Sequence, residues 1–114
     1  MGARTNYKII TTDNPDQNIG IYAHWDGSDG VFSLQHALGK AMPRIQMGDT
    51  AYATRIIIDQ ITKEGRDSET GYGIYIGDES YEEEYEYKEV NLVNNTVTIG
   101  SISFTLDEFL LAKV

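Results

Sequence analysis

The sequence predicts an α+β domain in which about five, mainly antiparallel strands carry two central helices and a short C-terminal helix on one face. Three observations lead to this prediction. Strand-like stretches lie at both ends of the chain, and two stretches of helical period lie between them. Hydrophobic residues make up 40% of the chain, and 114 residues are enough for one modest core but not for two. We therefore expect a single domain over residues 1–114.

The N-terminal part of the chain predicts two strands that form a hairpin. Residues 7–12 are mostly β-branched or aromatic, and the turn-forming residues around Pro15 end this stretch. Residues 19–25 read as the second strand, in which alternate side chains point to opposite faces. Alternation places on one face Ile19, Ile21, Ala23 and Trp25, and on the other Gly20, Tyr22 and His24. The glycines at positions 27 and 30 then predict a loop.

Two helices are expected between the strands. Ser33 can cap the first helix, whose apolar residues follow the three-and-four spacing until Pro43 ends it. Asp49 or Thr50 can cap the second helix, and Gly65 marks its end. One stripe of the second helix should face the core, and it consists of Ala53, Ile57 and Ile61.

The second half of the chain predicts three more strands. Residues 72–76 and 90–93 are interpreted as two antiparallel strands that are joined through residues 77–80 and the acidic residues after them. The Asn94-Asn95 pair tolerates a left-handed backbone. It therefore predicts a two-residue turn that pairs residues 96–99 with the preceding strand.

The last residues predict a short helix that packs on the sheet. Thr105 and Glu108 match the capping box, in which the hydroxyl reaches forward to a backbone N–H and the carboxylate reaches back. Apolar residues follow at positions 109–111 and would form the buried side of this helix.

The acidic segment, residues 78–89, holds seven carboxylates and a single lysine. It supplies much of the formal net charge of −9, which argues against direct binding of nucleic acid and favours a partner with a basic surface. In a strand, Glu82, Glu84 and Glu86 would form a row on one face. The predicted partner-binding residues are Tyr81, Glu82, Glu84, Tyr85, Glu86 and Tyr87. The alternative is a solvated edge strand whose charge blocks edge-to-edge pairing.

The densest group of chemically capable side chains is His24, Trp25 and Asp26, where a strand meets a glycine loop. A metal site would need a third ligand, which His36 can supply if the first helix folds back over this loop. No metal-binding spacing accompanies these residues, so we expect neither a metal nor a cofactor. The structural alternative is that Trp25 packs in the core or at its rim, His24 donates to a backbone carbonyl and Asp26 caps the turn.

The sequence does not predict an enzyme. The chain has no cysteine, its serines lie in no nucleophile motif, and its glycines match no phosphate-binding loop. A hydrolase that uses His24 and Asp26 is the remaining catalytic hypothesis. The N-terminus has no signal-peptide pattern and no apolar run is long enough to span a membrane, so we expect a soluble, non-secreted protein.

Three motifs occur in order between residues 19 and 76. They are Tyr22-Ala23-His24-Trp25-Asp26-Gly27, Asp49-Thr50-Ala51-Tyr52-Ala53-Thr54-Arg55-Ile56-Ile57 and Glu69-Thr70-Gly71-Tyr72-Gly73-Ile74. In this order and spacing, they resemble a group of small proteins of tailed bacteriophages, a group without a settled activity. The resemblance implies a viral accessory protein in the cytoplasm of the bacterial host, and it carries over no catalytic residues. The acidic segment has no counterpart in that group.

Charge and resemblance together give two functional hypotheses. The first is a non-enzymatic protein that binds and inhibits a bacterial host protein, either a nucleic-acid-handling or an anti-phage defence factor, through the acidic segment and by mimicry of nucleic-acid charge. The second is a small-ligand-binding protein or sponge, formed as a homo-oligomer, that captures a nucleotide-like signal. Its pocket would be lined by His24, Trp25, Asp26, Arg55, Glu69 and Tyr72. An ion pair of Arg55 with Glu69 or Asp26 would instead make this cluster structural.

Overall fold

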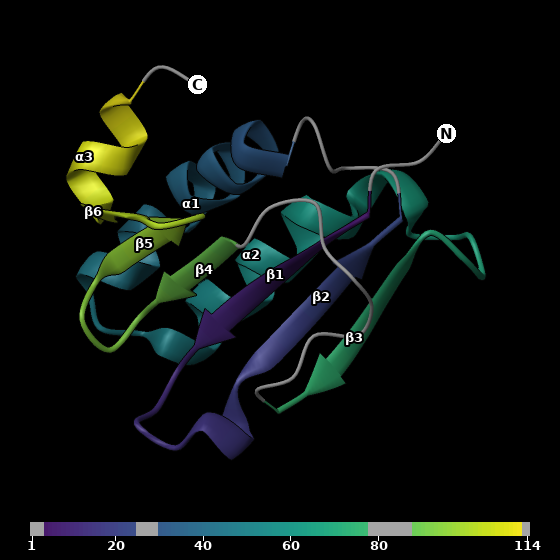
Figure 1. Ribbon diagram of the computed structural model, residues 1–114, viewed down its shortest axis with the longest axis horizontal. Coiled ribbons are helices and arrows are strands. Elements are labelled where there is room, and N and C mark those ends of the chain that lie inside the picture. The colour runs from purple at the N-terminus through teal and green to yellow at the C-terminus, as the bar shows by residue number, and fades with distance from the viewer. Residues whose placement is uncertain (1–3, 25–29, 78–87, 113–114) are drawn as a thin grey trace.

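The computed structural model describes residues 4–24, 30–77 and 88–112. The described strands form one sheet with helices packed on it (Figure 1). In chain order the strands are β1 (Thr5–Ile10), β2 (Ile19–Ala23), β3 (Tyr72–Ile76), β4 (Lys88–Asn91), β5 (Thr96–Ile99) and β6 (Ile102–Thr105). The helices are η1 (Pro15–Gln17), α1 (Gly30–Gln46), α2 (Thr50–Thr62), η2 (Lys63–Gly65) and α3 (Leu106–Leu111). The predicted α+β class is confirmed.

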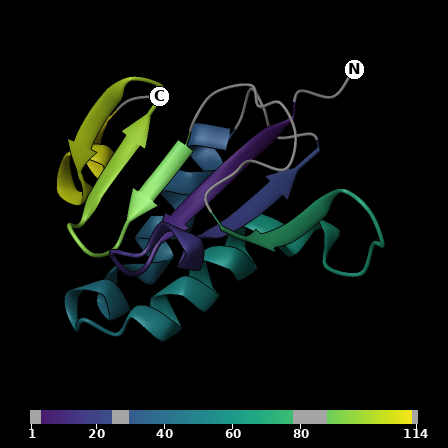
Figure 2. The same ribbon diagram turned by 60° about the horizontal axis from the view of Figure 1, so that its bottom comes forward.

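The strand order across the sheet is β3-β2-β1-β4-β5-β6. β1 and β4 run parallel in the middle of the sheet, and the other neighbouring strands are antiparallel. α1 and α2 lie side by side against one face of the sheet (Figure 2). The mainly antiparallel sheet and the β1–β2 hairpin are therefore confirmed, although the described residues form six strands where the sequence predicts about five.

The core lies between the sheet and the layer formed by α1 and α2. The described strands contribute six buried apolar side chains to the core, and these are Tyr7, Ile9, Ile21, Ala23, Val90 and Val97. The predicted stripe of α2 is buried, with Ala53, Ile57 and Ile61 at most 3% exposed. The Asp49 cap is confirmed too, because its Oδ1 accepts a hydrogen bond from Tyr52 N at 3.2 Å. None of the helices in the described ranges is long and apolar enough to cross a membrane.

α1 is longer than predicted at both ends. It begins at Gly30 instead of after a cap at Ser33, and it continues past Pro43 for almost another turn. Proline lacks an N–H, and its ring crowds the carbonyl four residues earlier, which usually ends or kinks a helix. That earlier residue is Gly39, which is exposed and has no neighbouring atoms around its Cβ position. The backbone there has room to adjust, and Ile45 beyond the proline packs against the core.

β3 and β4 do not form the predicted antiparallel pair. β2 and β1 lie between them, and the registers make β3 and β4 point in the same direction. Successive strands are neighbours only about two-thirds of the time. Tyr7 and Ile9, the apolar side chains of β1 on the helix face, are buried because β1 lies in the middle of the sheet. β1 therefore separates two strands that follow each other in the sequence.

The turn between β4 and β5 is longer than the predicted two residues. β4 ends at Asn91, and residues 92–95 lead to β5. Asn91 is the physical reason, because its Oδ1 accepts hydrogen bonds from the backbone N–H groups of Val93 and Asn94 at 2.9 and 3.0 Å. These bonds fold the chain before the strand can continue. Asn95 has the left-handed φ, 58°, that the sequence predicts for this turn.

β6 has no counterpart among the predicted strands. The Gly100-Ser101 pair reads as a simple break, but it is the turn of a tight hairpin, and Gly100 has a φ of 61°. The capping box after β6 is confirmed. Thr105 Oγ1 accepts from Glu108 N at 3.1 Å, and Glu108 Oε1 accepts from Thr105 N at 2.9 Å.

α3 packs against β6 and α1 at the far end of the sheet (Figure 1). Phe109 of α3 is fully buried, and its ring lies 5.7 Å from that of Phe104 on β6, measured between centroids. Gln35 of α1 donates from Nε2 to the carbonyls of Phe109 and Ala112 at 2.7 and 2.9 Å. The Phe109 carbonyl also accepts from Ala112 N at 3.2 Å, so Gln35 adds a second donor to it and ties the C-terminal end of α3 to α1.

Candidate binding surface around the edge strand

β3 is an edge strand of the sheet and pairs with β2 alone among the described strands. Gly71 and Gly77 flank it with φ values of 103° and 118°, which side-chain-bearing residues rarely adopt. Its Ile74 and Ile76 are 57% and 68% exposed, although both are large apolar residues. Neither isoleucine is among the site residues that the sequence predicts. Residues 72–76 contain neither a charged residue nor a proline, and the absence of these protective residues is the sequence signal that could have identified an unprotected strand.

The Tyr75 side chain covers the face of the sheet opposite the helices. Gly20 lies opposite Tyr75 in the register, and a Cβ at Gly20 would be only 2.1 Å from the Tyr75 ring. The ring therefore occupies the space that the glycine leaves. The Tyr75 hydroxyl reaches further, to β1, and donates to Asn6 Oδ1 at 2.7 Å. This side chain ties the edge strand to the centre of the sheet.

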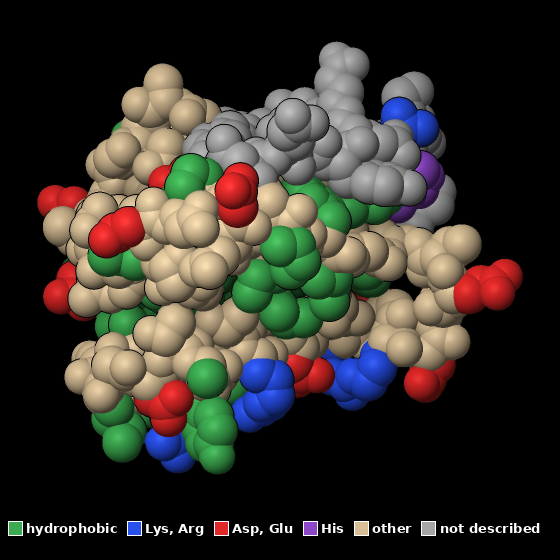
Figure 3. All heavy atoms as spheres, turned by 90° about the horizontal axis from the view of Figure 1, so that it is seen from below, with side chains coloured by type: hydrophobic (Ala, Val, Ile, Leu, Met, Phe, Trp, Pro, Cys, Tyr) green, Lys and Arg blue, Asp and Glu red, His purple; other side chains and the backbone are tan. Residues whose placement is uncertain are grey.

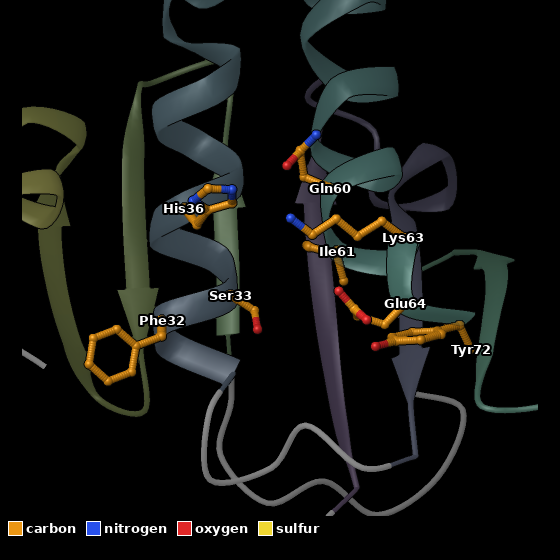
Figure 4. A pocket seen from close by; sticks show the side chains of 8 residues that line it. All are labelled: Phe32, Ser33, His36, Gln60, Ile61, Lys63, Glu64 and Tyr72. Atoms are coloured by element: carbon orange, nitrogen blue, oxygen red, sulfur yellow. The ribbon is translucent and has the colours of Figure 1, made fainter. Parts of the chain in front are cut away.

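Tyr72, at the start of β3, lies on the helix face. It is opposite Ala23 of the core in the register, and its ring covers Gly65 of η2, where a Cβ would be 2.6 Å from Cδ2. The ring forms one end of a pocket of about 330 Å³ between α1, the end of α2 and η2 (Figure 4). The lining residues are Phe32, Ser33, His36, Gln60, Ile61, Lys63, Glu64 and Tyr72.

The pocket combines several kinds of polar group. Figure 4 shows Lys63 extending from the end of α2 toward His36 on α1, while the Glu64 carboxylate lies close to the Tyr72 ring. Lys63 can donate to an anion, Glu64 can accept from a donor, and His36 can do either. The volume lies at the small end of the range for ligand pockets, about 300–1,000 Å³. The chemistry suits one small polar molecule with a flat group against Tyr72.

His24 directly follows β2, and strand alternation directs its side chain away from the helices. Its Nδ1 lies 2.7 Å from the Tyr22 hydroxyl, with which it shares a hydrogen bond. Its backbone N–H donates to Gly71 O at 2.9 Å. The His24 strand and the Tyr72 strand are neighbours, since Ala23 pairs with Tyr72. The two side chains nevertheless occupy opposite faces of the sheet.

His36 is exposed on α1, and the sheet separates it from His24. Among the described residues no group of three or more His, Cys, Asp or Glu side chains could hold a metal ion. Arg55 and Glu69 are both exposed, and no ion pair joins them. Trp25 and Asp26, the other two members of the predicted pocket, lie outside the described residues. Of the described members of that predicted set, Tyr72 alone lines the pocket described above.

The predicted partner-binding residues lie outside the described residues, in the connection between β3 and β4. These are Tyr81, Glu82, Glu84, Tyr85, Glu86 and Tyr87. The last two residues of the acidic segment, Lys88 and Glu89, begin β4. Lys88 pairs in register with Tyr7 and is fully buried on the helix face, where its Nζ donates to Thr5 Oγ1 at 2.8 Å. The single cation of the acidic segment is therefore withdrawn from the surface.

The other cations are unevenly distributed. Lys8 on β1 is only 9% exposed. Five of the nine lysines and arginines lie on α1, α2 or the turn after α2, and they are Lys40, Arg44, Arg55, Lys63 and Arg66. Seen from below, most of the visible Lys and Arg side chains gather on the side of the helical layer (Figure 3). Positive charge is thus concentrated on the layer that faces away from the open side of the sheet.

No family model, curated protein or solved structure gives a significant match to this chain.

Proposed function

We propose that this chain is a non-enzymatic binding protein that occupies and blocks a basic surface of a bacterial host protein, with the acidic segment as the main contact. The site of action is the host cytoplasm. The net charge of −9 supports an electropositive partner, because such a charge attracts basic surfaces and repels phosphate backbones. Nucleic-acid-handling and defence factors carry basic surfaces of this kind.

The burial of Lys88 is the observation that carries this proposal. An acidic run whose lysine reached the solvent would neutralise part of its own charge. Lys88 is 0% exposed instead, with its stem in the core and its ammonium bonded to Thr5. Within the acidic segment, the remaining charged residues are carboxylates. In the sequence, β3 precedes the segment by one residue, and the last two residues of the segment, Lys88 and Glu89, begin β4.

The test compares binding by the wild type and by a variant with Glu82→Gln, Glu84→Gln and Glu86→Gln. A partner is first captured from bacterial lysate and identified by mass spectrometry, and its affinity is then measured with purified proteins. Each lost exposed ion pair is worth up to about 1 kcal/mol, so the triple variant should bind about tenfold or more weakly.

The control carries Asp13→Asn, Asp16→Asn and Asp107→Asn, which changes the net charge equally at exposed sites elsewhere. It should retain the wild-type affinity. Equal affinities of the wild type and the glutamine variant would refute the proposal. Equal losses in both variants would do the same, because they would point to net charge instead of the acidic segment.

A second candidate function, the capture of a small nucleotide-like ligand, is favoured by the pocket between α1, η2 and Tyr72. Lys63 and His36 offer donors for a phosphate, and the Tyr72 ring offers a surface for a base. A panel of nucleoside monophosphates should raise the melting temperature of the wild type, and this shift should disappear in Lys63→Gln and Tyr72→Leu. The control is Lys40→Gln, an exposed cation of α1 that does not line the pocket. A melting-temperature shift of equal size in all three variants would exclude this pocket as the nucleotide-binding site.

A further inference from the structure

The β3 backbone has hydrogen-bonding groups that point out of the sheet. His24 N donates to Gly71 O at 2.9 Å, and Gly77 N donates to Asn18 O at 2.8 Å. In an antiparallel ladder hydrogen-bonded pairs alternate with non-bonded ones, so the odd-numbered residues 71–77 face β2. Residues 72, 74 and 76 therefore direct their N–H and C=O groups away from β2. For Ile74 and Ile76, no hydrogen bond to these outward groups occurs within the described residues.

The side chains of β3 do not protect this edge. Natural sheets usually guard an exposed edge with a charge, a proline, a bulge or a covering element. β3 has the sequence Tyr-Gly-Ile-Tyr-Ile, and its two isoleucines are more than half exposed. The opposite edge differs, because α3 follows β6 directly and packs against it. The β3 edge combines an outward backbone ladder with apolar side chains that an added strand would cover.

The charge around β3 selects the kind of strand that fits. Asp67 and Glu69 are exposed just before β3, and Asp78 and Glu79 follow Gly77 in the sequence. Carboxylates thus occur close in sequence to both ends of the strand. A second copy of this chain would bring another charge of −9 to this edge, which is unfavourable. A segment with lysine or arginine at its ends is favoured.

We propose that β3 accepts an extended, cationic segment of the partner protein as an added strand of the sheet. The outward N–H and C=O groups of Ile74 and Ile76 provide the hydrogen bonds, and β-branched or aliphatic side chains of the incoming segment pack beside these two isoleucines. Its basic residues lie next to Asp67 and Glu69, the exposed carboxylates just before β3. This inference rests on the proposed function and specifies the partner's chemistry, namely a basic extended segment of a protein.

The test uses a short peptide of alternating lysine and valine as the probe, with two modified peptides as controls. One control has N-methylated peptide bonds, which cannot donate hydrogen bonds, and the other has glutamate in place of lysine. The probe should bind the wild type at least about tenfold more tightly than either control. Amide hydrogen exchange of Ile74 and Ile76, followed by NMR, should slow about tenfold when the probe is bound.

The matched protein variants are Ile74→Pro and Ser103→Pro. Both remove an N–H that points out of an edge strand, so neither removes a backbone hydrogen bond between strands, and edge strands tolerate such prolines. Ser103→Pro also removes the exposed hydrogen bond between the Ser103 and Thr98 hydroxyls, 3.2 Å long. Ile74→Pro should weaken probe binding about tenfold, whereas Ser103→Pro on β6 should leave it unchanged. Circular dichroism verifies the fold of each. The peptide controls test the same claim on the wild type and do not depend on the folding of either variant.

Equal binding of the N-methylated peptide, or slowed exchange at β6 instead of β3, would overturn the added-strand model. A wild-type dimer that Ile74→Pro dissociates would also overturn it, since a second copy would then be the occupant. Host-partner binding that survives Ile74→Pro but not the glutamine substitutions would reject this inference alone and leave the proposed function standing. The proposed function would be refuted by a different result, namely host-partner binding that the glutamine substitutions do not change.

Discussion

Replacing Lys88 by alanine is expected to lower the free energy of unfolding by about 2–5 kcal/mol. The side chain is fully buried, and its Cε lies 2.5 Å from the position that a Cβ of Gly30 would take. Alanine would leave a cavity against the first residue of α1. It would also remove the donor to the Thr5 hydroxyl, which is itself 0% exposed. Urea unfolding followed by circular dichroism measures the loss.

Lys88→Met is the matched control, because methionine keeps a long unbranched side chain but has no charge. We expect it to lose less stability than the alanine variant, about 1–2 kcal/mol, from the lost polar contacts of the ammonium, among them the bond to Thr5 Oγ1. This comparison separates the packing of the stem from the bonding of the ammonium. If Lys88→Ala cost less than about 1 kcal/mol, the side chain would not be a buried part of the core.

Phe109→Ala is expected to cost about 3–5 kcal/mol and to release α3 from the sheet. Phe109 has none of its surface exposed and packs on Phe104. α3 has only six residues, so its helical structure depends on this contact and cannot persist alone. Thermal unfolding gives the stability loss, and NMR shifts of residues 106–111 report whether the helix persists.

Leu111→Ala provides the control on the same helix. Leu111 is 84% exposed, so its truncation should change stability by no more than about 0.5 kcal/mol. A comparable loss in both variants would show that α3 does not depend on the buried phenylalanine in particular. That outcome would contradict the packing described for this end of the sheet.

Local signals in the sequence predicted much of the fold. The capping box at Thr105, the Asp49 cap and the buried stripe of α2 depend on residues a few positions apart, and all three are confirmed. The errors arose where distant contacts decide the outcome. A proline ends most helices, yet α1 continues past Pro43, because the packing of its last turn against the core outweighs the cost of the proline. Strand order is also decided by contacts between distant residues, and no short motif predicts that β1 lies between β2 and β4.

The candidate surface was harder to predict than the fold. Sequence reasoning selected Tyr72 but paired its strand with residues 90–93, whereas it lies next to the strand that precedes His24. It also could not tell which face each side chain would occupy. His24 and Tyr72 are separated by the sheet because adjacent register positions alternate in direction. Ile74 and Ile76 look like ordinary core residues in the sequence. Only the position of β3 at the edge exposes them.

The parallel pairing of β1 with β4 affects how the chain reaches its native state. The Thr5–Lys88 hydrogen bond joins residues 83 positions apart, and it lies in the middle of the sheet. Contacts between such distant residues require a large loop to close, which slows folding. During synthesis, the first strand cannot acquire its second neighbour until residue 91 has left the ribosome. The N-terminal hairpin and both long helices must therefore wait for the acidic segment before the domain can fold.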